Sequence, residues 1–209
     1  LRILFGCLLY ERKNFMKDCR TNDDSALHED GGACPSGSRQ KWYAVQVRTG
    51  SECITARLCK SVMNQSVLTD CFIPRYERMR RYQAQWHQEY PIMFPGYIFL
   101  ITDKVNALYE ELKHVPRLTK ILGNGVEFIP LKEEETELLA AMGSREHITA
   151  MSRGYIAGDR IIITEGPMKE MAGQIRFIDR HKRIAVVQME MFGRKLDIRL
   201  GLEIVKKIV

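Results

Sequence analysis

The feature that most constrains this chain of 209 residues is a change of pattern near residue 142. Between residues 41 and 142, stretches of alternating apolar and polar residues are interleaved with stretches of helical spacing, which predicts strands packed against helices. Beyond residue 154 only short alternating segments remain, broken at glycines or charged turns, and this pattern is typical of a small β-barrel. We therefore predict an α+β chain in which an α/β sandwich with an antiparallel sheet (residues 41–142) precedes a five-stranded barrel (residues 155–209).

Two polar segments lie outside these predicted domains. Residues 1–40 include TNDDSALHEDGGACPSGSRQ, which is rich in Gly, Ser and Asp and has no apolar periodicity, so we predict disorder there. Since the chain opens on Leu and Met16 lies inside it, an over-extended reading of the gene is an alternative interpretation. Residues 143–154, GSREHITAMSRG, are predicted to form a flexible linker between the two domains.

The first domain is predicted to follow the order strand, helix, strand, strand, helix. KWYAVQVRT alternates as a strand does, and Ser51 can cap a helix whose Ile54, Leu58 and Val62 share one apolar face. DCFIPRYERMRRYQ predicts a strand that runs into a basic hairpin, and WHQEYPIMFPGYIFLIT predicts the returning strand. The other predicted helices cover residues 104–113 and 132–142.

The composition favours a partner of negative charge and argues against several classes of protein. The formal net charge is +6, and residues 153–209 hold 12 Lys or Arg against 7 Asp or Glu, which suits RNA, DNA or the ribosome. No apolar run approaches the roughly 18 residues that a membrane span needs, so we expect a cytoplasmic protein with no membrane contact. The six cysteines form no C-x-x-C pair, and we therefore expect neither a metal site nor a cofactor.

A catalytic function would have to draw on scattered groups. No triad order, metal-ligand spacing or phosphate-binding loop is present, so we expect the protein not to be an enzyme. An RNA-processing enzyme with an accessory barrel is kept as an alternative. The groups open to such an enzyme are Cys53, Cys59, Cys71, His87, His114 and Glu133 to Glu135.

The basic stretch RYERMRRYQAQW is a candidate nucleic-acid site. Its arginines alternate with aromatic residues, and guanidinium groups meet phosphates while aromatic rings stack on unpaired bases. The alternative is a solvated hairpin tip, which is the commoner role of such a charge run. The residues predicted to bind nucleic acid are Arg75, Arg78, Arg80, Arg81 and Tyr82.

Two separate motifs resemble parts of one known family. GDRIIITEGPMKEMAGQIRFIDRHKRIAVV resembles the KOW motif of transcription and ribosomal proteins, and we expect its isolated Gly173 to serve a backbone angle or close approach that a side chain forbids. MFGRKLDIRLGLEIV resembles the end of an SH3-like KOW barrel. WYAVQVRTGSE, FPGYIFL, HVPRLTKILG and IPL resemble, in order and spacing, the NGN domain of NusG. Together these motifs cover residues 41–208 and are similar to the NusG family of transcription elongation factors.

The resemblance implies an apolar surface that docks on the clamp helices of RNA polymerase. Aromatic side chains suit such a surface because they bury a large area and lose little conformational entropy. Core packing is an equally weighted alternative for Trp42 and Tyr97, whereas Phe94, in a predicted loop, is the better contact candidate. The matching positions are Trp42, Tyr43, Phe94, Pro95, Gly96 and Tyr97.

The resemblance also implies a second partner for the barrel: ribosomal protein S10, termination factor Rho or nucleic acid. Met168 stands where the family has Phe, and Met is a weaker anchor, whereas Phe192 in FGR matches the family. The matching contact positions in the barrel are Met168, Phe192, Arg180, Lys182 and Arg183.

Within the family, the IDRHKR turn and LDIRLGLEIVKK resemble LoaP, a paralogue that acts in antitermination. This resemblance implies a bacterial, monomeric factor that binds RNA polymerase and a leader RNA hairpin or the non-template DNA, and that promotes read-through of terminators in specific operons. The first alternative is a general NusG that links polymerase to Rho or the ribosome. The second is a ribosomal structural protein, which would leave the NGN-like half unexplained.

Overall fold

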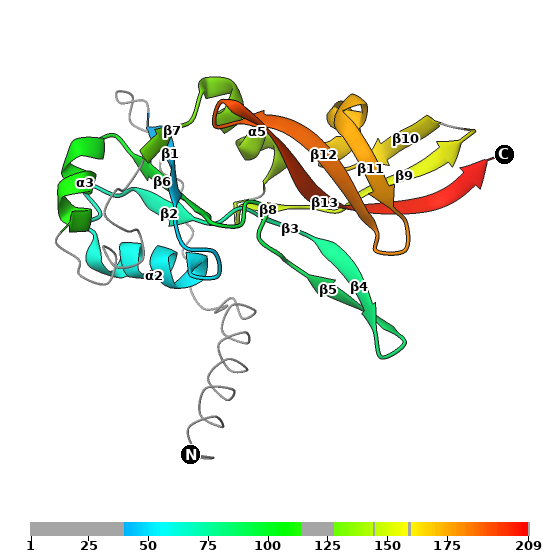
Figure 1. The fold of residues 1–209 in the computed structure, drawn as a ribbon, viewed down its shortest axis with the longest axis horizontal. Coiled ribbons are helices and arrows are strands. Elements are labelled where there is room, and N and C mark those ends of the chain that lie inside the picture. Colours follow the sequence, from blue (N-terminus) through cyan, green and yellow to red (C-terminus); the bar gives the residue numbers. More distant parts are fainter. Residues whose placement is uncertain (1–39, 114–127, 144, 159, 209) are drawn as a thin grey trace, which may run out of the picture. The chain divides into compact units, whose positions relative to one another are not determined.

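The computed structural model describes residues 40–113, 128–143, 145–158 and 160–208. Arg39–Val209 form one compact unit, whose elements are labelled in Figure 1. The predicted disordered segment and the HVPRLTKILGNG stretch with His114 lie outside the described residues. No helix in the described part of the chain combines the length and apolar character that crossing a membrane requires.

An antiparallel sheet of four strands is the framework of the N-terminal half, as the sequence predicts. Its order is β2, β6, β1, β7, so that the first strand lies beside the FPGYIFLI strand. The register sets Tyr43 of β1 opposite Leu100 of β6. The bounds are Lys41–Gln46 for β1, Asp70–Phe72 for β2, Tyr97–Thr102 for β6 and Phe128–Pro130 for β7.

Helices α2 (Glu52–Val62) and α3 (Val105–Lys113) cover one face of this sheet (Figure 1). Since alternate strand residues point to opposite faces, Val45 packs into a cluster with Cys59 of α2 and Leu108 of α3. The other face carries α5 (Glu133–Met142). There Ala44 and Phe99 share a cluster with Leu139.

The predicted apolar face of α2 is wrong. Ile54 and Val62 are 37% and 51% exposed, and Leu58 is half-buried. The helix is instead turned so that small side chains approach the sheet and the first carboxylate reaches backbone N–H groups beneath it. Its buried residues are Glu52, Thr55, Ala56 and Cys59.

The predicted basic hairpin is confirmed. Strands β4 (Arg78–Tyr82) and β5 (Gln85–Glu89) pair antiparallel and follow the short strand β3 (Arg75–Tyr76). Gln83 and Ala84 between them have φ of 51° and 60°. A two-residue turn with both φ values positive matches the right-handed twist of the strands, although glycine or asparagine usually supplies it.

A second sheet of five strands forms the C-terminal half, in the order β10, β9, β13, β12, β11. The long β13 pairs antiparallel with β12 as far as Gly201 and parallel with β9 from Leu202 onward, so one strand joins both parts of the sheet. The bounds are Ser152–Ala157 for β9, Arg160–Glu165 for β10, Ile175–Asp179 for β11, Ile184–Met191 for β12, Arg194–Ile208 for β13 and Pro167–Gln174 for the 3-10 helix η1.

Parts of the predicted linker take up regular structure. Ile148–Thr149 form strand β8, which pairs parallel with β3, and Thr149 also bridges Gly143. Strand β9 then begins at Ser152, three residues before the predicted start of the barrel. Ile148 and Thr149 pair with Arg75 and Tyr76 of β3, at the base of the hairpin. Local composition does not reveal a pairing between residues so far apart in the sequence. The flexibility of this connector stays a prediction.

The expected role of Gly173 is wrong, because a Cβ built there meets no atom within 4 Å and its φ is not in the left-handed region. Gly166 and Gly201 are among the glycines that do carry such a constraint. Gly166 has a φ of +93°, and a Cβ on it would lie 2.6 Å from Oγ of Ser152. Gly201 lies so close to the carbonyl oxygen of Glu77 that a Cβ could not fit between them. The second sheet therefore packs directly against the base of the hairpin.

Candidate functional site

The FPGY loop, residues 94–97, is held by a buried carboxylate. Glu52 is 2% exposed, and its Oε1 accepts a hydrogen bond of 2.7 Å from the N–H of Gly96. Its Oε2 accepts a second bond of 2.7 Å, from the N–H of Gly50. Bonds from N–H groups to an ionised acceptor are stronger than neutral ones, so Glu52 fixes the loop against the start of α2.

The predicted polymerase-contact residues differ widely in exposure. Tyr43 and Phe94 are 8% and 4% exposed, and Gly96 is buried. Pro95 is exposed, whereas Trp42 and Tyr97 are half-buried. The loop position of Phe94 thus does not expose its side chain, which packs against Phe99 and against Phe192 of the C-terminal sheet. Closure of that sheet into a barrel stays a prediction, and the name barrel is kept for strands β9 to β13.

Phe192, in the turn between β12 and β13, covers the FPGY loop. Its ring stacks on Tyr97 with 5.1 Å between the centroids, and it lies 5.8 Å from the ring of Phe94 and 6.0 Å from that of Phe99. The guanidinium of Arg194 also donates a hydrogen bond of 2.6 Å to the hydroxyl of Tyr97. Two groups predicted to bind separate partners therefore contact each other within this chain.

Two further carboxylates tie the barrel to the N-terminal half. Oε1 of the buried Glu135, in α5, accepts a hydrogen bond of 2.7 Å from the N–H of Phe192. Glu77 accepts from the N–H of Met151 at 3.1 Å through Oε2 and from Gln88 at 2.6 Å through Oε1. The contact between the halves thus combines aromatic packing with bonds that fix its position.

Among the predicted barrel contacts, Met168 stands apart. Its side chain is fully buried, at 0% exposure, and its N–H donates to Oγ of Ser152 at 3.1 Å. In this arrangement Met168 is a core residue, because no part of it reaches the surface. Arg180 and Lys182 are exposed in the turn between β11 and β12, and Arg183 is half-buried.

Two of the predicted RNA-binding arginines are engaged inside the structure. Arg75 donates to the carbonyl of Tyr90 at 2.8 Å and to Sγ of Cys53 at 3.1 Å. Arg78 donates to one carboxylate oxygen of Glu89 through Nε at 3.1 Å and Nη2 at 2.7 Å. These contacts hold the base of the hairpin, so little of either guanidinium is open to a ligand.

The tip of the hairpin is open. The side chain of Arg80 is 62% exposed and approaches Glu89 at 3.5 Å. Arg81 is exposed and makes no ion pair with any described residue. Tyr82 is 42% exposed and stacks on His87 with 3.6 Å between the ring centroids. Arg80, Arg81 and Tyr82 are therefore the members of the predicted set that a nucleic acid could reach.

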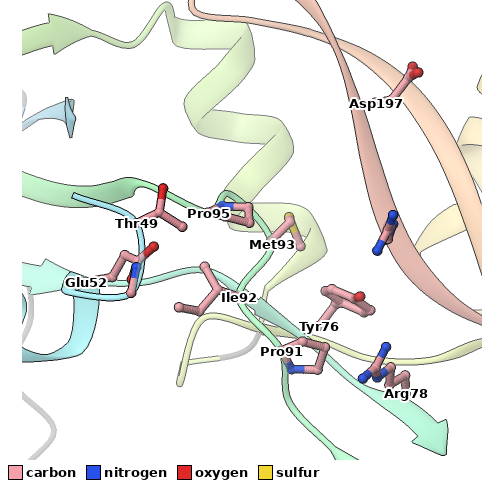
Figure 2. A pocket seen from close by; sticks show the side chains of 11 residues that line it. Thr49, Glu52, Tyr76, Arg78, Pro91, Ile92, Met93, Pro95 and Asp197 are labelled. Atoms are coloured by element: carbon pink, nitrogen blue, oxygen red, sulfur yellow. The ribbon is translucent and has the colours of Figure 1, made fainter. Parts of the chain in front are cut away.

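A cavity of about 690 Å³ lies where the FPGY loop, the hairpin base and β13 meet. Figure 2 shows Tyr76 and Arg78 on one side of it and Asp197, on β13, on the other. Arg199 of β13 also lines it and adds a second guanidinium. Burial raises the pKa of Tyr76, against the opposing effect of Arg78 and Arg199, so the phenol stays neutral near pH 7.

Most of the groups considered for an enzyme lie in the described residues. No group of three or more His, Cys, Asp or Glu side chains there could hold a metal ion. Cys59 and Cys71 are both buried, and their mutual hydrogen bond together with burial raises the pKa of Cys71, which keeps this thiol protonated. Of the remaining groups, Cys53 lies on α2, His87 on β5 and Glu133 to Glu135 on α5, while His114 lies outside the described residues.

Sequence reasoning missed the carboxylates that hold this region together. Glu135 was considered only among the groups open to an enzyme, and neither Glu52 nor Glu77 was singled out. A signal existed for one contact, because the hairpin register pairs Arg78 with Glu89. The bonds from Glu52 to Gly96 and from Glu135 to Phe192 join residues far apart in sequence, so no local pattern marks them.

Comparison with known proteins finds similarity to one family. Residues 40–140 match the family described as transcription termination factor nusG. The chain is 25% identical over 178 residues to the transcription termination/antitermination protein NusG of Haemophilus influenzae, covering 82% of this chain and 96% of that protein. It is 20% identical over 176 residues to the NusG of Campylobacter jejuni, covering 82% and 99%.

Among solved structures, one described as domain interaction in Thermotoga maritima NusG aligns with a TM-score of 0.47 and 22% identity over 78% of this chain and 94% of that one. Residues 40–140, slightly under half of the chain, thus match the NusG family model, and the chain is similar to NusG proteins along most of its length.

Proposed function

We propose that this chain is a LoaP-like antitermination factor, which binds the clamp helices of RNA polymerase through its FPGY loop and a leader RNA hairpin through its basic hairpin. No catalytic step is involved. By binding the elongating state of polymerase more tightly than the paused state, the factor shifts the population toward elongation and lets polymerase read through terminators. A monomer in the bacterial cytoplasm suits this role.

The observation that carries the polymerase contact is the FPGY loop held by Glu52. The loop presents Pro95 at the surface and the half-buried ring of Tyr97, and the two bonds to Glu52 fix its backbone before any partner arrives. A fixed apolar loop loses little conformational entropy on binding, which favours tight association. Trp42 and Tyr43, on the neighbouring strand β1, belong to the same proposed surface.

The packing of the barrel on the FPGY loop restricts the access of polymerase to this loop. Because Phe192 stacks on Tyr97 and contacts Phe94, polymerase can reach these rings only after the barrel moves away. If the closed arrangement dominates, the apparent affinity for polymerase is lowered by the fraction of molecules that are open. Barrel release is therefore part of the proposed mechanism.

The RNA contact is carried by the exposed tip of the hairpin. Arg80 and Arg81 can reach phosphates, and the exposed part of Tyr82 can stack on an unpaired base. Non-template DNA offers the same two chemical groups when it is single-stranded, and is the second nucleic acid to be tested.

A general NusG is the alternative function. In that case the barrel would link polymerase to Rho or to ribosomal protein S10 through Phe192, Arg180, Lys182 and Arg183. The buried position of Met168 disfavours a contact at the remaining predicted position. Leader-dependent read-through belongs to the specialised factor, whereas a general factor acts on all templates alike.

The polymerase contact is tested with Pro95→Glu in the full chain. This change puts a carboxylate on the exposed point of the FPGY loop without touching its core, and we expect at least a tenfold loss of affinity for core RNA polymerase, measured by biolayer interferometry. Asn106→Glu is the control, since Asn106 is exposed on α3 and is not part of the proposed surface. Equal affinities of the two variants, or sedimentation with ribosomes in place of polymerase, would remove the proposed contact.

A further inference from the structure

The cavity between the FPGY loop, the hairpin base and β13 has a lining that the proposed function does not use, apart from Pro95. Its volume of about 690 Å³ is that of a site for a small molecule. Such sites combine an apolar wall with a few polar groups that orient the ligand. The residues around this cavity are divided in the same way.

One side of the cavity is apolar. It is formed by the segment that leads into the FPGY strand, with the half-buried Pro91 and Ile92, the buried Met93 and the exposed Pro95. The two prolines have no N–H, and the N–H of Met93 donates to the carbonyl of Pro74 at 2.8 Å. This side therefore suits the apolar part of a ligand.

The opposite side carries positive charge. Arg199, on β13, is exposed to the cavity and forms no ion pair within the described part of the chain. Arg78 donates to Glu89 through Nε and Nη2, which leaves its Nη1 for another acceptor. Burial raises the pKa of Tyr76 and both guanidinium charges oppose this shift, so all three groups lie close together.

The carboxylates that line the cavity leave this charge uncompensated. Both oxygens of Glu52 already accept bonds from backbone N–H groups of the loops beneath it. Asp197 accepts a bond of 3.4 Å from Gln188, and Figure 2 shows it apart from Arg78. The guanidinium of Arg199 is therefore open to an anion that enters the cavity.

We propose that this cavity binds a small organic acid, with its anionic head on Arg199 and its apolar body against Pro91, Ile92 and Met93. Carboxylate and phosphate heads share the chemistry that a guanidinium recognises. The neutral hydroxyl of Tyr76 can donate a further hydrogen bond to the head. A neutral apolar molecule would leave Arg199 unused, and an inorganic anion would leave the apolar side without a partner.

The site has a consequence for polymerase binding, which rests on the proposed function. The cavity has walls from both halves of the chain, so the acid binds the arrangement in which the barrel packs on the FPGY loop. Polymerase requires the barrel to move away from that loop. The acid therefore lowers the apparent affinity for polymerase, and polymerase lowers the affinity for the acid by the same factor.

The test is isothermal titration calorimetry of the full chain with three acids whose bodies differ: decanoate, 2-naphthoate and phenyl phosphate. We expect at least one of them to bind with a dissociation constant of about 1 mM or lower. Acetate has the head alone and 2-naphthol has the body without the charge, so both should bind at least about tenfold more weakly. Absence of binding by all three acids would overturn the inference.

The position of the site is tested with Arg199→Gln, which removes the charge and keeps a long polar side chain. We expect it to weaken binding of the acid about tenfold or more. Arg176→Gln is the control, because Arg176 is exposed on β11, two strands away from β13, and does not line the cavity. Circular dichroism melting shows whether both variants are folded. Equal affinities of the two folded variants would overturn the assignment to this cavity.

The outcomes separate this site from the proposed function, because the titration uses the chain without polymerase. An acid that lowers the affinity for polymerase in the wild-type chain but not in Arg199→Gln would support both the site and its consequence. An acid that binds through Arg199 and leaves the affinity for polymerase unchanged would support the site and overturn the consequence. Failure of the Pro95→Glu prediction would remove the polymerase contact and leave the titration of the acid as it stands.

Discussion

Phe192→Ala should raise the affinity of this protein for polymerase, the proposed partner of the FPGY loop. The substitution removes the ring that covers Tyr97 and Phe94 and leaves the backbone bond to Glu135 in place. If polymerase binds only the open arrangement, loosening the barrel raises polymerase affinity. The proposed RNA contacts at the tip of the hairpin do not involve Phe192, so we expect the affinity for RNA to stay unchanged.

The size of the effect follows from the contacts that are lost. Phe192 makes ring contacts with Phe94, Tyr97 and Phe99. Each such pair contributes about 0.5–1.5 kcal/mol beyond area burial, and Phe→Ala costs about 3–5 kcal/mol at fully buried sites. Since Phe192 is half-buried, we take a loss of about 2 kcal/mol in the free energy with which the barrel packs on the FPGY loop. This loss corresponds to about a 30-fold shift in the ratio of open to closed molecules. The apparent dissociation constant for polymerase falls by up to that factor while the closed form dominates.

The assay is biolayer interferometry with immobilised core polymerase, run beside an RNA gel shift on the same preparation. Phe177→Ala is the control, because Phe177 is a barrel phenylalanine that is 60% exposed. Circular dichroism melting shows whether each variant is folded. An unchanged affinity for polymerase in a folded Phe192→Ala variant would refute the reasoning. A loss of polymerase affinity would show that Phe192 itself belongs to the interface.

Three other substitutions test separate parts of the structure. Glu52→Gln leaves one oxygen for two N–H donors, so we expect the free energy of unfolding in urea to fall by about 2–3 kcal/mol. The control is Glu134→Gln at an exposed position, and a decrease no larger than that of the control would contradict this. Burial lowers the pKa of His147 below 6.5, against the attraction of Asp70. The unfolded chain therefore binds this proton first, and the stability of the fold decreases as the pH drops through about 6.5. His147→Phe should reduce the difference in urea midpoint between about pH 7.5 and about pH 5.5, and an undiminished difference would refute the assignment. Gly201→Ala forces a Cβ against the carbonyl of Glu77, so we expect a lower melting temperature and a gain in polymerase affinity of the same sign as for Phe192→Ala, and an unchanged melting temperature would contradict the close packing.

Much of the secondary structure could be predicted from periodicity, because local spacing determines it. The helix predicted from Ser51 is found at Glu52–Val62, and the basic hairpin has the predicted strands. The face that α2 buries could not be predicted in this way. It is set by the bonds from Glu52 to Gly50 and Gly96, and a buried carboxylate with backbone partners looks in sequence like an ordinary first-turn glutamate.

The sequence suggests candidate site residues, which stay predictions, but it does not show how they are arranged. Arg80, Arg81 and Tyr82 are exposed as nucleic-acid binding requires, whereas Arg75 and Arg78 have structural partners. The stacking of Phe192 on Tyr97 and of Arg183 on Trp86 joins residues roughly a hundred positions apart. Contacts of that separation follow from how the two sheets pack and leave no periodic signal in the chain.

The most direct test of the account is single-round transcription through a terminator placed downstream of the leader that precedes this protein's own target operon. We expect the full chain to raise read-through on that template and not on a template with a scrambled leader hairpin, and we expect Arg80→Gln with Arg81→Gln to abolish the difference. Equal read-through on both templates would contradict leader-specific antitermination and favour a general NusG.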